Sequence, residues 1–219
     1  MAVTGKQAAG GYAVYTGPVL ALYDSFVLGF SNRFVWNCPT KRIVRLYDSA
    51  VSANHLEVGP GTGFYLTRVC FPSKMPRIAM MDKNRQCLEH AGRLLSRYHP
   101  ETYHADILEP LTVSPRPFDS VGLNYVLHCL PGSLPAKAAV FKRLKNLMNP
   151  GAVLFGSTIL HSGVARGPLA RLLMGAYNVF GIFTNSNDDL AGLTRILGEQ
   201  FSEVSVEAVG CVALFSARV

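Results

Sequence analysis

His55-Leu56-Glu57-Val58-Gly59-Pro60-Gly61-Thr62-Gly63-Phe64-Tyr65-Leu66 is the stretch that decides the fold of this 219-residue chain. A short apolar run ends at an acid, and three glycines follow within five residues. Glycine is needed where the backbone takes a positive φ or approaches a ligand closely. A buried strand that leads through such a turn into a helix is a nucleotide-binding arrangement. We therefore expect a strand, a ligand-cradling turn and a helix over Thr62–Cys70.

The composition predicts a soluble globular protein. Apolar residues make up 49% of the chain and charged residues 16%, and 219 residues suffice for one sizeable core, so we expect a single domain over residues 1–219. No charged leader with a cleavage site opens the chain, and Asp24 interrupts the apolar segment Val19–Phe30, which predicts no membrane span and a cytoplasmic protein.

Cysteine usage and charge also exclude some classes of function. The five cysteines are widely spaced, without a Cys-x-x-Cys pair or a nearby histidine, so we expect reduced, mostly buried thiols and no metal site. The net charge of +7 comes from scattered basic residues, which argues against a dedicated nucleic-acid surface. The sequence leaves open whether the protein is a monomer or a homodimer.

Strand and helix patterns alternate around the glycine turn. Apolar residues recur at helical spacing after Pro18 and again after Pro39, which predicts a helical N-terminal cap over residues 1–50. Further strands are expected at Arg77–Asp82, Tyr103–Ala105, Phe118–Asn124 and Ala152–Ile159, with helices at 88–95 and 133–148 between them. Strands that alternate with helices at this spacing require crossovers, and so a parallel sheet covered on both faces.

The C-terminal part has a different pattern. Helical segments occupy residues 160–200, and the last residues predict two strands joined through the short link Glu207–Gly210. Such a link suits a hairpin, which places an antiparallel strand in an otherwise parallel sheet. The expected fold class is α/β, with a Rossmann-like doubly wound sheet, mostly parallel with an antiparallel C-terminal strand, plus N-terminal helices.

Residues around the glycines discriminate between two classes of nucleotide. The dinucleotide fingerprint Gly-x-Gly-x-x-Gly requires glycine at the sixth position, where this chain has Phe64. Glu57, two residues before the first glycine, would repel a pyrophosphate docked on a helix N-terminus. S-adenosylmethionine has no phosphate and carries an ammonium and a sulfonium, both of which an acid stabilises.

At these residues the chain resembles the class I S-adenosylmethionine-dependent methyltransferases. The resemblance covers residues 50–160 by motif and the C-terminal hairpin by pattern, and it implies S-adenosyl-L-methionine as cofactor and S-adenosyl-L-homocysteine as product. It assigns cofactor contacts to four segments in order: Glu57, Gly59, Pro60, Gly61, Thr62 and Gly63 at the methionine part; Asp82 and Lys83 at the ribose; Asp106, Ile107 and Leu108 at the adenine; and Asn124 and Tyr125 on the substrate side. Asp82 is equally plausible as a helix N-cap, and Asp106 as a cap or turn residue.

Methyl transfer is an in-line displacement, so the protein mainly aligns donor and acceptor and removes a proton where needed. His128, at the ligand-facing end of a predicted strand, is the first candidate for a base, and His161 is a weaker one. The alternative for His128 is a structural histidine that caps the turn or bonds to backbone beneath the cofactor.

Two segments are expected to shape the pocket for the methyl acceptor. They are the N-terminal cap and an insertion over residues 160–185 that forms a lid, with Tyr12, Tyr15, Tyr23, Tyr177 and Phe180 as candidate substrate contacts. Aromatic residues at helical spacing also fit simple core packing. The expected acceptor is a small, partly apolar or aromatic metabolite.

Three rival functions are distinguishable. An RNA methyltransferase acting on exocyclic amines would resemble its family in an Asn/Asp-Pro-Pro-aromatic motif, where this chain has Asn124-Tyr125-Val126-Leu127. A metal-dependent catechol-type enzyme needs acids that neither 124–130 nor 158–163 contains. A non-methylating cyclase or pericyclase that binds the same cofactor stays open, because binding and transfer share residues.

Overall fold

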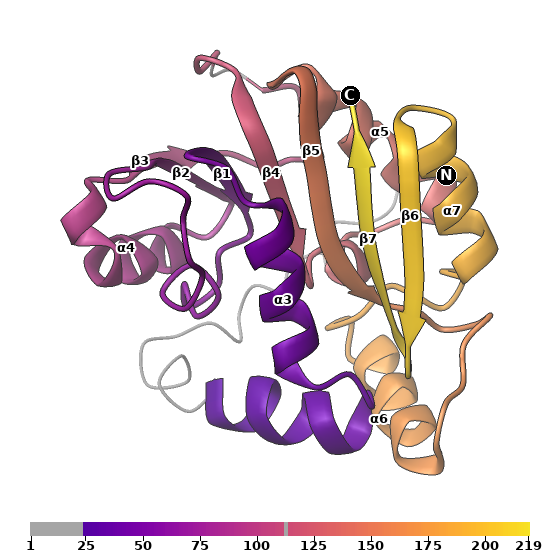
Figure 1. The fold of residues 1–219 in the computed structure, drawn as a ribbon. Helices are drawn as coiled ribbons and strands as arrows, with labels where there is room; N and C mark the ends of the chain where they lie inside the picture. The colour runs from indigo at the N-terminus through magenta and orange to yellow at the C-terminus, as the bar shows by residue number, and fades with distance from the viewer. Residues whose placement is uncertain (1–23, 112–113) are drawn as a thin grey trace.

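The computed structural model describes residues 24–111 and 114–219, and these form a seven-stranded sheet in the order β3-β2-β1-β4-β5-β7-β6 (Figure 1). The strands are β1 (Asn54–Val58), β2 (Arg77–Asp82), β3 (Glu101–His104), β4 (Phe118–Asn124), β5 (Met148–Ile159), β6 (Ser202–Val209) and β7 (Val212–Arg218). The first five strands pair in parallel, and β7 lies antiparallel between β5 and β6. The predicted Rossmann-like fold class, with its antiparallel C-terminal strand, is confirmed.

Helices cover both faces of this sheet (Figure 1). They are a π-helical segment Asp24–Val35 and the α-helices α3 (Thr40–Ala50), α4 (Arg85–Leu94), α5 (Leu134–Lys145), α6 (Pro168–Val179) and α7 (Leu190–Gly198). Side chains of α3, α4 and α6 join one hydrophobic core, and those of α5 and α7 join another. The two cores lie on opposite faces, because alternate residues of a strand point to opposite sides of a sheet.

The alternation is visible within β2. Ile78 and Met80 contribute to the core with α3 and α4, whereas Ala79 and Met81 contribute to the core with α5. All four are buried, which explains why the strand is a continuous apolar run in the sequence. The same double burial makes β1 and β4 recognisable from sequence alone.

The helix expected over Thr62–Cys70 does not form, and the segment is a series of turns. Gly63 has φ +79°, in the left-handed region, which is incompatible with a helix that starts at Thr62. The Thr67 hydroxyl and the Arg68 guanidinium both donate to the carbonyl of Phe64, at 2.8 and 3.2 Å. Side chains that compete for backbone carbonyls in this way favour turns over a helix.

Several element boundaries also differ from expectation. The third strand covers Glu101–His104 where Tyr103–Ala105 was expected, and α4 covers Arg85–Leu94 where a helix was expected at 88–95. The helix predicted over 133–148 ends at Lys145, and β5 starts at Met148, before the Pro150-Gly151 pair that was expected to separate them. The helix expected with Pro39 in its first turn begins one residue later, at Thr40, and Pro39 is its N-cap.

The strand order reverses at β1, which lies between β2 and β4. In an open α/β sheet, ligands bind beyond the carboxyl ends of the strands at such a reversal. The Asp24–Val35 segment and α6 lie at this same end of the sheet, in the lower part of Figure 1. The fold therefore directs the search for a site to the ends of β1, β2 and β4.

Candidate functional site

Two adjoining clefts lie at the carboxyl ends of β1, β2 and β4. The first cleft runs beside the ends of β2 and β3, and the second lies behind the glycine turn against Asn124. Gly59, Gly61 and Tyr125 line both clefts, so the two form one groove bent around these residues. The sequence-predicted residues that line the groove are Glu57, Gly59, Pro60, Gly61, Thr62, Asp82, Lys83, Asp106, Ile107, Asn124 and Tyr125.

Two predicted residues lie beside the groove and do not line it. Gly63 packs against α4, where an added Cβ would be 3.1 Å from the Cβ of Ala91. Leu108 packs against the hydrophobic core, and its amide donates to Asp106 Oδ1 at 3.0 Å. Both support the groove through packing and turn geometry.

Gly59 is the point at which the backbone must lack a side chain. Its φ is +68°, and a Cβ would lie 2.4 Å from Cγ2 of Val126 across the groove. Its amide donates to the carbonyl of Met81 at 2.8 Å, which ties the turn to β2. The turn is thereby fixed close to the opposite wall, as close approach to a flat ligand requires.

Glu57 ends β1 as a buried carboxylate with 3% of its surface exposed. Its Oε1 accepts from the Tyr47 hydroxyl at 2.6 Å, and its Oε2 lies 3.1 Å from His55 Nε2. The neighbouring strand makes room for it at Gly122, where a Cβ would be 2.3 Å from Glu57 Oε2. The carboxylate is therefore held in place from α3, from its own strand and from β4.

Asp82 ends β2 and lines the first cleft. Burial raises its pKa to about 6, opposed by the backbone amides of Asn84 and Lys83 and by His104. Oδ1 accepts from the Asn84 amide at 2.7 Å, while Asn84, and not Asp82, is the N-cap of α4. The N-cap alternative for Asp82 is therefore wrong, and its carboxylate is held by the backbone at the end of β2.

Asp106 follows β3 and pairs with Lys83. Lys83 Nζ lies 2.7 Å from Asp106 Oδ2, and the other carboxylate oxygen accepts the Leu108 amide. The turn interpretation of Asp106 is therefore confirmed alongside its position in the first cleft. Ile107, 5% exposed, presents an apolar surface to the same cleft.

Tyr125 takes a strained conformation where the two clefts meet. Its φ is +56°, which costs free energy for a residue with a bulky side chain, and such strain gathers at functional sites. Its hydroxyl donates to Asn32 Oδ1 at 2.9 Å, and its amide donates to the carbonyl of Ser157 at 2.8 Å. Asn32 is fully buried in the Asp24–Val35 segment, so the N-terminal cap is bonded directly to the site.

His128 lies beneath the groove and lines neither cleft. It is 3% exposed, its Nδ1 accepts from the Ile159 amide at 3.3 Å, and its ring packs edge-on against Phe183. Burial, with a smaller contribution from Lys137, lowers its pKa to about 3. The imidazole is thus neutral, and its Nδ1 already accepts a backbone hydrogen bond, which matches the structural alternative for this residue.

The remaining predicted residues do not gather at the groove. His161 is half-buried past the end of β5, and its pKa is lowered by burial and by Arg166. Tyr177 packs edge-on against Phe183, with ring centroids 5.0 Å apart, and Phe180 is 71% exposed. Tyr12, Tyr15 and Tyr23 lie outside the described residues.

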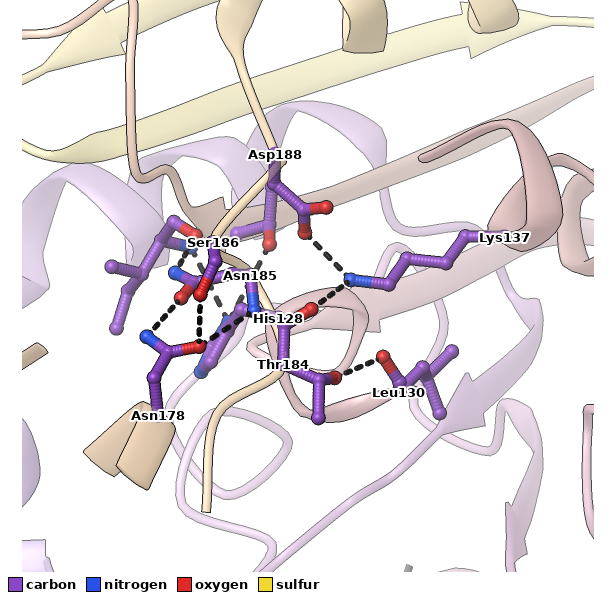
Figure 2. A network of polar contacts seen from close by, with 10 residues as sticks. His128, Leu130, Lys137, Asn178, Thr184, Asn185, Ser186 and Asp188 are labelled. Atoms are coloured by element: carbon purple, nitrogen blue, oxygen red, sulfur yellow. Dashed lines mark hydrogen bonds and ion pairs between the residues drawn. The ribbon is translucent and has the colours of Figure 1, made fainter. Parts of the chain in front are cut away.

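A buried polar network holds one wall of the first cleft (Figure 2). Lys137 Nζ lies 2.7 Å from Asp188 Oδ2 and donates to the carbonyl of Thr184 at 3.1 Å. The Thr184 amide donates to the carbonyl of His128 at 2.8 Å. Both charged side chains are at most 1% exposed, and Thr184 lines the cleft. The pair therefore fixes a wall residue that is distant in sequence from the motifs.

The same network anchors the end of the predicted lid. Asn178 and Asn185 bond to each other through side chain and backbone, at 2.9 and 3.2 Å, and Asn185 Nδ2 donates to the carbonyl of Ile159 at 2.9 Å. In Figure 2 these amides lie beside Ser186, to the left of the Lys137–Asp188 pair. The C-terminal end of the 160–185 segment is thus tied to β5.

Sequence reasoning missed several residues of the groove. They are Asn32, Tyr47 and His55 as partners of predicted residues, and Cys87 and Thr184 as lining. Asn32 meets Tyr125 from 93 positions away, and Cys87 and Thr184 reach the groove from other elements, so no local pattern distinguishes these three residues. Among the described residues, no group of three or more His, Cys, Asp or Glu is arranged to hold a metal ion. Within the same part of the chain, no helix has the length and apolar character needed to cross a membrane.

Comparison with known proteins gives a consistent result. Residues 35–195 match a family model described as a methyltransferase domain. The chain is 36% identical over 212 residues to demethylluteothin O-methyltransferase of Streptomyces thioluteus, covering 97% of this chain and 92% of the relative. It is 34% identical over 209 residues to the physcion biosynthesis cluster O-methyltransferase of Aspergillus chevalieri, covering 94% of each. Its fold is similar to that of DhpI solved with S-adenosylhomocysteine, with a TM-score of 0.68, 16% identity and coverage of 99% of this chain and 98% of that one.

Proposed function

Because this chain belongs to the S-adenosylmethionine-dependent methyltransferase family, we propose that its bent groove aligns the cofactor with a hydroxyl group of a small, partly apolar acceptor. The observation that carries the proposal is the pair of carboxylates, Glu57 and Asp82, at the ends of adjacent strands on either side of the glycine turn. Both the chemical class of the acceptor and the role of each residue in the groove belong to this proposal.

The residues of the groove fit S-adenosylmethionine. Gly59 lets the turn pack directly against Val126, and the two clefts that meet there match a ligand with an adenosine part and an amino-acid part. The carboxylates of Glu57 and Asp82 would repel a pyrophosphate, whereas they stabilise cationic and hydroxyl groups of a ligand. When bound, the cofactor supplies a methyl group on a sulfonium that is open to in-line displacement.

We assign the first cleft to the adenosine part and the second to the methionine part. Asp82 accepts hydrogen bonds from the ribose hydroxyls, and Asp106, held by Lys83, lies with Ile107 at the adenine. Glu57 lies on the side of the methionine ammonium. Asn124 and Tyr125 separate the cofactor from the acceptor, and the strained backbone of Tyr125 keeps that partition in place.

The proposed acceptor is an acidic hydroxyl, such as a phenol or an enol. Both reported relatives are named as O-methyltransferases, which supports oxygen as the receiving atom. No histidine lines either cleft within the described residues, and His128 is occupied by the Ile159 amide. An acceptor that ionises readily needs no strong base, so alignment by the groove supplies most of the rate. His128 is therefore proposed as a structural residue.

Residues 160–185 and the N-terminal cap are proposed to bound the acceptor side. The anchored end near Asn185 supports a fixed wall there, and any closing motion belongs to the part around α6. The five cysteines are all free, which supports a reducing compartment such as the cytoplasm. The acceptor is proposed to be a metabolite and not a nucleic acid, because the Asn-Pro-Pro-aromatic pattern is absent after β4.

The test uses S-adenosylmethionine carrying a carbon-13 methyl group, incubated with the protein and an extract of phenolic and enolic metabolites. We expect a labelled product whose methyl carbon has the NMR shift of a methoxy group. A labelled methylamine would contradict oxygen as the acceptor atom. Tight cofactor binding with a rearranged but unlabelled product would identify the non-methylating alternative.

A further inference from the structure

A buried chain of polar contacts runs behind Glu57, away from the groove. His55 Nε2 lies 3.1 Å from Glu57 Oε2, and its Nδ1 lies 2.9 Å from the Ser120 hydroxyl on β4. The Ser120 hydroxyl in turn accepts from the Ser52 amide at 2.9 Å. His55 and Ser120 are fully buried, so this part of the chain is shielded from water.

The second arm of this chain comes from the N-terminal cap. The Tyr47 hydroxyl on α3 donates to Glu57 Oε1 at 2.6 Å. Burial, and then the charge of Glu57, raises the pKa of Tyr47 well above its usual value, so the phenol keeps its proton and acts as a donor. Its ring is stacked on Tyr65 at 5.3 Å and meets Phe155 edge-on at 4.9 Å, which fixes the direction of the hydroxyl.

The hydrogen-bond directions follow from these contacts. Because Tyr47 and His55 approach different oxygens of Glu57, an ionised carboxylate accepts from both. His55 then carries its proton on Nε2, with Nδ1 accepting from Ser120. An ionised group buried to this depth requires such donors, since an unsatisfied one costs several kcal/mol. Each donor also removes one rotational freedom of the Glu57 side chain.

We propose that His55 and Tyr47 are positioning residues that hold the Glu57 carboxylate in one orientation for the ammonium of the cofactor's methionine part. The inference rests on the proposed function, which assigns the second cleft to that part. Glu57 lines the second cleft, whereas His55 and Tyr47 do not, so they act on the ligand only through it. The adenosine part, in the first cleft, is independent of this arrangement.

This independence provides a test by calorimetry with two probes. S-adenosylhomocysteine carries the amino-acid part, and 5′-methylthioadenosine lacks it while keeping the adenosine. The variants are His55→Phe, which keeps a ring of similar size against Phe155, and Tyr47→Phe, which removes only the hydroxyl. Asp82→Asn is the matched control, since it alters the adenosine side.

We expect His55→Phe and Tyr47→Phe each to weaken S-adenosylhomocysteine binding about tenfold, the effect of losing a hydrogen bond to a charged group, while methylthioadenosine binding changes by less than about twofold. Asp82→Asn should weaken both probes. Unchanged S-adenosylhomocysteine binding in both ring variants would overturn the inference, and so would an equal loss for both probes, which signals a general structural role.

Failure of the proposed function gives a different result. If Glu57→Gln binds S-adenosylhomocysteine as tightly as the wild type, the second cleft does not hold the ammonium, and the assignment of the two clefts is wrong. If Glu57→Gln weakens binding but neither ring variant does, only the positioning role is wrong. Should His55→Phe fail to fold, Tyr47→Phe alone decides, because it leaves the aromatic packing of α3 intact.

Discussion

His128 illustrates how the environment of one residue decides its role. The ring is enclosed by Tyr125 and Phe183, and the backbone amide of Ile159 occupies Nδ1. A pKa lowered to about 3 means that the folded protein keeps this imidazole neutral across the physiological range. We therefore propose that His128 stabilises the junction between β4 and β5 instead of acting as a base.

The depressed pKa of His128 predicts acid sensitivity. Below the usual histidine pKa of 6.5 the unfolded chain takes up a proton, and the folded chain does not until about pH 3, so stability falls as the pH falls through this window. The slope from this group is roughly 1.4 kcal/mol per pH unit. The amide oxygen of His128→Asn can replace Nδ1 as the acceptor. Between pH 7 and pH 5, the free energy of unfolding of this variant in urea should therefore fall less than that of the wild type.

The same variant tests the catalytic prediction. Retention of the single-turnover methyl-transfer rate within about threefold is expected if His128 is structural, because a general base contributes 10²–10⁴-fold. A loss of a hundredfold with unchanged cofactor affinity would instead restore His128 as the base. Parallel pH–stability curves for the two proteins would contradict the buried, neutral imidazole.

At the scale of elements, the pair Lys137–Asp188 joins α5 to the loop before α7. Burial lowers the pKa of the Lys137 ammonium and raises that of the Asp188 carboxyl, and the attraction between them opposes both shifts. Asp188 Oδ1 has no hydrogen-bond partner within the described residues, so the carboxylate depends on Lys137 for its compensation. The pair thereby couples the packing of two helices to the cleft wall at Thr184.

Removal of one partner of this ion pair is expected to be costly. Lys137→Met leaves a buried carboxylate without its cation, which should reduce the free energy of unfolding by about 3–5 kcal/mol. The double variant Lys137→Met/Asp188→Leu should lie closer to the wild type, since it buries no charge. Urea unfolding of the single and double variants at one pH measures both, and a double variant as unstable as Lys137→Met would contradict the account.

For the whole molecule, the groove lies where three strands of the sheet end, so ligand binding should stabilise the entire fold. At one hundred times its Kd, S-adenosylhomocysteine is expected to add about 2.7 kcal/mol to the free energy of unfolding. For a chain of this size that corresponds to a rise in Tm of roughly 5–10 °C. Differential scanning calorimetry measures the shift, with NAD⁺ at the same concentration as the control that should cause none. A larger shift with NAD⁺ would contradict the interpretation of Glu57.

The sheet could be predicted from the sequence because its strands are buried on both faces. Arg77–Asp82 and Phe118–Asn124 were expected with the bounds that the structure has, and the acids at the ends of β1 and β2 lie in the groove as expected. The wrong prediction, a helix over Thr62–Cys70, relied on local propensity where a glycine at positive φ and side-chain bonds to Phe64 prevail.

The rest of the site depends on contacts that no local pattern encodes. Tyr125 meets Asn32, 93 positions away, and adopts a φ that a tyrosine rarely takes. Thr184 enters the first cleft because Lys137 and His128 hold its backbone from two other elements. Such residues carry ordinary polar or aromatic side chains, and only the tertiary structure reveals which of them support the groove.

The lack of a side chain at Gly122, which makes room for Glu57, limits which substitutions the two positions can accept. A Cβ at that position would lie 2.3 Å from Glu57 Oε2, so Gly122→Ala alone must displace the acid or shift the strand. Glu57→Asp shortens the side chain by one methylene and vacates that volume. We therefore expect Glu57→Asp to suppress the effect of Gly122→Ala. A side chain at position 122 is thus compatible only with a shorter acid at position 57.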